Sequence, residues 1–116
     1  MQRSVAILVL CLAIAVLFLT PIASAQTFRG AIQGTVLDSS GASVSGAQVT
    51  VTDTATNLSR EATSGEGGEF LFGELPLGTY KVSATKAGFR TAVADGIRVA
   101  TAITQRVDLT LSPGEA

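Results

Sequence analysis

The chain contains no histidine, no tryptophan and a single cysteine, Cys11. Because there is no histidine, the chain has no Ser–His or Cys–His pair that could perform nucleophilic catalysis. Structural zinc sites need the same missing side chains. Aromatic residues make up only 5% of the chain, which leaves few rings for the flat surfaces that bind sugars. We expect no catalytic residue, no cofactor and no metal, and predict that the protein is not an enzyme.

The chain also lacks an excess of charge of one sign. Eight lysines and arginines stand against nine acidic residues, so the net charge is −1. A nucleic-acid-binding protein typically carries a cluster of basic residues on one face. This balance predicts no nucleic-acid partner.

One long apolar run is present, from Val5 to Leu19. Arg3 precedes it and Ala23-Ser24-Ala25 follows it, which is the order of a secretory signal peptide. As a helix the run would extend about 22 Å, short of a hydrocarbon core of about 30 Å. We predict a signal-peptide helix in residues 1–25, cleavage between Ala25 and Gln26, and no membrane span in the mature chain. An uncleaved membrane anchor is the alternative.

After a short leader at residues 26–30, apolar and polar residues alternate in short segments separated by glycine-containing turns. Such alternation indicates strands with one buried face. The segments are 31–37, 47–52, 58–64, 69–72, 79–85, 89–100 (with a break at Asp95-Gly96) and 103–111. Seven short strands with frequent turns predict an antiparallel β-sandwich over residues 31–111, followed by a C-terminal tail at 112–116.

The inward positions of these strands form one predicted core. Its members are Val36, Val49, Val51, Phe70, Phe72, Tyr80 and Val82. Residues 58–64 are the most polar of the seven segments, as is typical of a sheet edge. Because an edge strand can accept a partner strand, we predict that Leu58, Arg60, Ala62 and Ser64 form a partner-binding edge.

Two groups of acidic and polar residues have a chemical interpretation. Glu66 and Glu69 flank Gly67-Gly68, and paired acids can serve as general acid and base in a cleft. Asp38-Ser39-Ser40-Gly41 offers oxygen atoms that a calcium ion could use. Both groups lie in turn sequences, so a solvated loop and an ordinary turn are the favoured interpretations.

Several spaced motifs occur in order along the chain. They are Gly34-x-Val36-x-Asp38-x-x-Gly41, Gly46-Ala47-x-Val49-x-Val51, Gly68-x-Phe70-x-Phe72, Gly78-x-Tyr80-x-Val82 and Ala87-Gly88-Phe89. With them, residues 30–111 resemble the carboxypeptidase regulatory-like domain. The resemblance implies a Greek-key sandwich of the transthyretin-like, prealbumin-like type, in a wider group that includes starch-binding-like domains.

Two further motifs narrow the resemblance. Residues 54–60 and Asp95-Gly96-Ile97-x-Val99 are similar to the N-terminal domain of Oar-like TonB-dependent outer-membrane receptors. This implies an exported, non-catalytic interaction or accessory module, either periplasmic, outer-membrane associated or secreted. Its partner would be a protein of the cell envelope, such as a receptor plug or barrel. The alternative function is that of a carbohydrate-binding module of the starch-binding-like group.

Overall fold

The structure of the protein is a computed structural model that describes residues 2–19 and 28–114. Residues of the first range form one helix, α1 (Gln2–Leu19), and those of the second form eight strands. No helix within the described ranges is long and apolar enough to cross a membrane. The predicted cleavage site between Ala25 and Gln26 lies outside the described residues.

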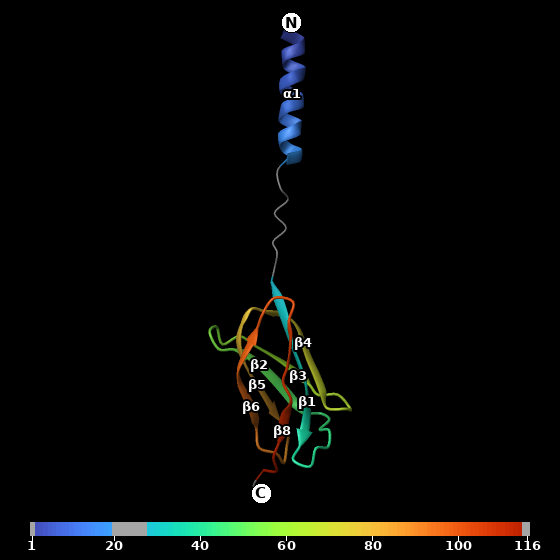
Figure 1. The fold of residues 1–116 in the computed structure, drawn as a ribbon, viewed down its shortest axis with the longest axis vertical. Helices are drawn as coiled ribbons and strands as arrows, with labels where there is room; N and C mark the ends of the chain where they lie inside the picture. Colours follow the sequence, from blue (N-terminus) through green and yellow to red (C-terminus); the bar gives the residue numbers. More distant parts are fainter. Residues whose placement is uncertain (1, 20–27, 115–116) are drawn as a thin grey trace.

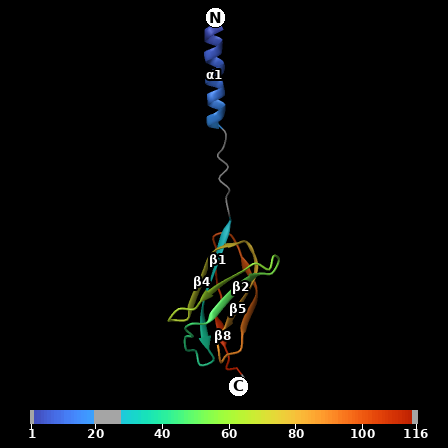
Figure 2. The ribbon, with the colours of Figure 1, turned by 180° about the vertical axis from the view of Figure 1, so that it is seen from behind.

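The strands form two four-stranded sheets that face each other as a sandwich (Figures 1 and 2). The first sheet contains β1 (Arg29–Asp38), β4 (Glu69–Pro76), β7 (Thr104–Arg106) and β8 (Leu109–Leu111). The second contains β2 (Gln48–Asp53), β3 (Ser59–Thr63), β5 (Gly78–Thr85) and β6 (Ala92–Val99). Their orders are β4–β1–β7, with β8 also on β1, and β3–β2–β5–β6. The predicted sandwich is thus confirmed, although β7 and β8 run parallel to β1.

The described strands number eight rather than the predicted seven because the last predicted strand, 103–111, is interrupted. Val107 still donates its backbone N–H to Gln33 O at 2.8 Å. At the next position the Asp108 side chain replaces the backbone, since its Oδ1 accepts the N–H of Thr35 at 3.0 Å. This substitution of a side chain for a carbonyl divides the strand into β7 and β8.

Gly34 permits the close approach at this interruption. A Cβ atom at Gly34 would overlap the carbonyl oxygen of Val107 and lie 2.8 Å from Cζ of Phe70. Only glycine fits here, because the β7–β8 junction crosses directly over its Cα atom.

Bulges account for two other departures from the predicted strands. The predicted break at Asp95-Gly96 is an irregularity inside a continuous β6, and Gly96 adopts a φ of 70° there. The fourth strand extends to Pro76 instead of ending at residue 72. Its pairing with β1 shifts register across Gly73–Glu74, where Glu74 has a φ of 56°. A bulge therefore lets the strand continue beyond the predicted end.

The core lies between the two sheets and confirms the predicted inward positions. All seven predicted core side chains are buried, and further members come from β1, β4, β5, β6 and β8, from the β1–β2 connection and from Val107. One polar side chain, Ser64, is buried among them at 4% exposure. Its hydroxyl donates to Val44 O and accepts the N–H of Ala47, both at 2.8 Å. These hydrogen bonds compensate for its removal from water.

Candidate functional site

The edges of the sandwich differ in how readily each could accept another strand. β4 contains the Gly73–Glu74 bulge and ends in proline, and β6 is bulged at Asp95-Gly96. β7 and β8 are three residues each and are interrupted by Val107 and Asp108. Bulges, prolines and short strands all discourage pairing at an edge. β3 has none of these features, and its pairing with β2 is in continuous register.

The backbone of β3 exposes a regular set of hydrogen-bonding groups. Ser64 N–H donates to Ala47 O, and Asp53 N–H donates to Leu58 O, both at 2.8 Å. Because hydrogen-bonded pairs alternate along an antiparallel ladder, the even-numbered residues of β3 bond to β2. The backbone N–H and C=O groups of Ser59, Glu61 and Thr63 therefore point away from the sheet.

The structure divides the four residues of the predicted partner-binding edge. Ser64 is buried and its hydroxyl is used inside the fold, and Ala62 is half-buried against the core. Arg60 and Leu58 are exposed, Leu58 at 73%. All four alternate with the residues that carry the outward backbone groups. The prediction located the edge but named the residues whose side chains face the core side of it.

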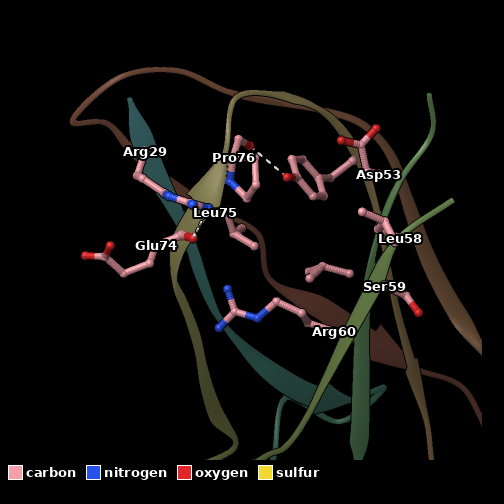
Figure 3. A pocket seen from close by; sticks show the side chains of 10 residues that line it. Arg29, Asp53, Leu58, Ser59, Arg60, Glu74, Leu75 and Pro76 are labelled. Carbon is pink, nitrogen blue, oxygen red and sulfur yellow. Dashed lines mark hydrogen bonds between the residues drawn. The ribbon is translucent and has the colours of Figure 1, made fainter. Parts of the chain in front are cut away.

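A cleft of about 350 Å³ opens beside this edge, between β3 and β4 (Figure 3). We call it the β3–β4 cleft. It is lined by Arg29, Val51, Asp53, Leu58, Ser59, Arg60, Glu74, Leu75, Pro76 and Tyr80. Figure 3 shows Arg60 extending from β3 across the gap toward β4, while the Glu74 carboxylate points away from the gap.

Two arginines hold the backbone of β4 at the cleft. Arg60 Nη1 donates to Gly73 O at 2.7 Å, and its guanidinium carbon lies 5.9 Å from the centre of the Phe72 ring. Arg29 Nη1 donates to Glu74 O at 3.2 Å. A guanidinium carries five N–H donors, so each arginine retains donors beyond these contacts. In the described part of the chain neither is paired with a carboxylate.

Tyr80 forms the inner wall of the cleft. Its side chain is buried, and its hydroxyl donates to Pro76 O at 2.7 Å. Burial raises the pKa of Tyr80 above its usual value, the negative charge of Asp53 raises it further, and Arg29 and Arg60 act in the opposite direction. Asp53 itself accepts the N–H of Ala55 at 2.9 Å and so stabilises the turn after β2. The cleft therefore combines two arginines with the carboxylate of Asp53 at its inner end.

The other acidic groups form no comparable site. Glu66 and Glu69 are both exposed, as expected of a solvated loop. Asp38 Oδ1 accepts the Ser40 hydroxyl at 2.6 Å and the N–H of Ala42 at 3.0 Å. These hydrogen bonds, the Ser40 hydroxyl first, lower the pKa of the Asp38 carboxyl below its usual value. The described residues contain no group of three side chains that could hold a metal ion.

Sequence reasoning did not find the β3–β4 cleft. It assigned Tyr80 correctly to the core, but nothing in the sequence indicates that Arg29 and Arg60 meet at one opening. The two arginines belong to different sheets. The available signal was weak: an arginine at an inward position of a predicted edge strand.

The fold and its motifs define the family. The carboxypeptidase regulatory-like domain matches residues 31–112. The chain belongs to this family, which confirms the resemblance seen in the sequence. A search of curated proteins found no significant match.

Several solved structures share the fold at low sequence identity. The TIE protein of Bacillus anthracis aligns with a TM-score of 0.63 and 24% identity, over 74% of this chain and 17% of that protein. A candidate carbohydrate-binding protein from Pseudomonas aeruginosa aligns with a TM-score of 0.51 and 23% identity, over 76% of this chain and 92% of that one. Another from Bacteroides uniformis has a TM-score of 0.57 and 20% identity, over 72% and 41%. The chain thus spans less than half of two of these proteins.

Proposed function

We propose that the protein is a non-catalytic interaction module of the cell envelope that binds an extended segment of a partner protein along β3. The partner strand would pair with the outward backbone groups of Ser59, Glu61 and Thr63. Main-chain hydrogen bonds would supply affinity, and the neighbouring side chains would supply selectivity.

The regular backbone of the β3 edge carries this proposal. Each other edge in residues 28–114 has a bulge, a proline or an interruption, whereas β3 pairs continuously with β2. Natural proteins usually protect long open edges because such edges promote aggregation. An edge whose backbone stays regular, in a sandwich whose other edges are bulged or interrupted, is consistent with use as a binding surface.

The composition and the N-terminal sequence support a module that is non-catalytic and exported. The absence of histidine and the lack of a metal-binding group in the described residues favour a module without catalysis. The apolar run at Val5–Leu19 and the Ala23-Ser24-Ala25 sequence favour export. The similarity of residues 54–60 to Oar-like receptors makes a receptor plug or barrel a suitable partner.

A proline at Glu61 tests strand addition directly. The N–H of Glu61 faces outward, so Glu61→Pro removes a donor that a partner needs without removing a bond to β2. Ala62→Pro would be a poorer test, because the N–H of Ala62 points toward its partner Val49 on β2 and its loss would remove a bond within the sheet. Glu61→Ala is the matched control, since it removes the same side chain but keeps the N–H.

The measurement compares the proteins that each form retains from an envelope extract, using protein secreted with its own N-terminus and purified from a bacterial periplasm. We expect the wild type and Glu61→Ala to retain the same partner and Glu61→Pro to lose it. With the partner bound, the amides of Ser59, Glu61 and Thr63 should become protected from hydrogen exchange. Identical retention by all three forms, or no protection of these amides, would show that β3 is not the binding edge.

Carbohydrate binding is the second candidate, because two of the similar solved structures are candidate carbohydrate-binding proteins. The aromatic residues offer it little support. Phe70, Phe72 and Tyr80 are buried, and Phe89 is half-buried. Phe28, at 56% exposure, is the remaining exposed ring among residues 28–114. Retention of polysaccharide and no protein by the wild type would favour this function over strand addition.

A further inference from the structure

Arg60 occupies an unusual position for an edge strand that is open to pairing. Its side chain faces the inner side of β3 and lies over the Phe72 ring. A charge that points inward at a sheet edge opposes the addition of a strand, because an apolar partner would bury the charge without compensation. Arg60 therefore excludes most strands from an edge whose backbone is otherwise ready to accept one.

We infer that β3 selects a partner strand that places an acidic side chain beside Arg60, at the mouth of the β3–β4 cleft. This inference rests on the proposed strand addition and names the chemistry of its partner. An aspartate or glutamate would convert the excluded charge into an ion pair, so one residue would both reject other strands and recognise the correct one.

The alternation of the ladder places the acidic residue. Arg60 bonds to β2 through its backbone, so an antiparallel strand added outside β3 would form its hydrogen bonds with Ser59 and Glu61. The partner residue opposite Arg60 would then belong to a non-hydrogen-bonded pair, in which the side chains approach most closely. Such pairs share one face of the sheet and have Cβ atoms about 4.5–5.5 Å apart. A carboxylate there lies within reach of the guanidinium.

The charges around the cleft favour an acid at this position. Arg60 and Arg29 keep donors free after bonding to Gly73 O and Glu74 O. Asp53 accepts the N–H groups of the turn after β2, and Glu74 points away from the gap (Figure 3). Within the described ranges neither arginine forms an ion pair with a carboxylate, so a partner carboxylate at this opening could bond to the free donors of either one.

Leu58 extends the recognition by one further position. It lies two residues before Arg60 and lines the same cleft, with 73% of its surface exposed. A partner residue opposite Leu58 would face the same side of the added strand. Burying Leu58 requires that residue to be apolar. The partner strand should therefore carry an acidic and an apolar residue two positions apart.

Selection from a random 12-residue peptide library displayed on phage tests this inference. The bait is the periplasmically purified protein with its own N-terminus. We expect the wild type to enrich peptides that contain Asp or Glu two positions from an apolar residue. Glu61→Pro should lose these peptides, because strand addition requires the outward N–H. Arg98→Gln, which removes an exposed arginine from β6, should enrich the same peptides as the wild type.

Binding of the best acidic peptide then isolates the role of charge. Arg60→Gln and Arg29→Gln should each weaken its binding by about threefold to tenfold, while binding to the same peptide with Gln in place of its acid should change little. Thermal unfolding of each variant shows whether it is folded. If Arg60→Gln does not fold, the composition of the wild-type pool and the Arg29→Gln variant still decide the question.

The outcomes distinguish selection by Arg60 from strand addition at β3. Peptides that require the Glu61 N–H but show no acidic enrichment would overturn the selection by Arg60 and leave strand addition intact. Peptides that bind Glu61→Pro as well as the wild type would overturn strand addition, and the inference with it. Failure of the wild type to enrich any peptide would overturn both.

Discussion

Replacing Phe72 by alanine is the most direct test of how the sandwich is stabilised. Phe72 is 1% exposed, pairs with Ile32 across β1 and β4, and lies 6.1 Å from the Phe70 ring centre. The replacement removes the ring from a closed interior and leaves a cavity that the surrounding strands can fill only in part. Substitutions of this kind cost about 3–5 kcal/mol.

That cost is a large share of the total stability. A folded unit of about 80 residues has a free energy of unfolding of about 4–12 kcal/mol, at roughly 0.05–0.15 kcal/mol per residue. Each kcal/mol lowers the midpoint of thermal unfolding by about 4–8 °C at this size. We therefore expect Phe72→Ala to lower the midpoint by at least about 12 °C, or to unfold the protein at room temperature.

The adjacent residue provides the matched control. Leu71 lies on the opposite face of β4 and is 63% exposed, so Leu71→Ala should change stability by no more than about 0.5 kcal/mol. Urea and thermal unfolding followed by circular dichroism measure both variants. Equal destabilisation by the two substitutions would show that the inner and outer faces of β4 are wrongly assigned.

Three further predictions concern single positions. Gly34→Ala should lower the free energy of unfolding in urea by at least about 1–3 kcal/mol, because the new Cβ overlaps Val107 O. Gly73→Ala is the control and should be nearly neutral, because a Cβ there would meet nothing within 4 Å. Similar costs for the two variants would contradict the close crossing at Gly34. The raised pKa of Tyr80 means that folding favours its neutral form. The stability that this group contributes should therefore be fully present below pH 10 and be lost as the pH rises through its folded-state pKa. Tyr80→Phe should remove this alkaline loss and cost about 1 kcal/mol at neutral pH through the hydrogen bond to Pro76 O, and a wild-type stability that is flat with pH in the alkaline range would disprove the linkage. The intact mass of the exported protein should correspond to cleavage between Ala25 and Gln26; a product that retains residues 1–25 would support the membrane-anchor alternative.

Local patterns in the sequence were sufficient for the sandwich and its core. The alternation of Val49 and Val51 with threonines, and the spacing of Phe70 and Phe72 two residues apart, indicate which side of each strand is buried. This works because side chains in a strand alternate between faces with a period of two, so a few residues define the whole face. The polar composition of residues 58–64 likewise identified an edge, because an edge strand is less enclosed by neighbours.

Only the tertiary structure decided what happens where distant segments meet. The interruption between β7 and β8 depends on the crossing of Val107 over Gly34, and Asp108 completes it by bonding to Thr35. The burial of Ser64 depends on Val44 and Ala47. The meeting of Arg29 and Arg60 at one cleft depends on β3 and β4 lying beside each other at the same side of the sandwich. These features arise from contacts between residues far apart in the chain, and a pattern that extends over a few neighbouring residues carries no record of them.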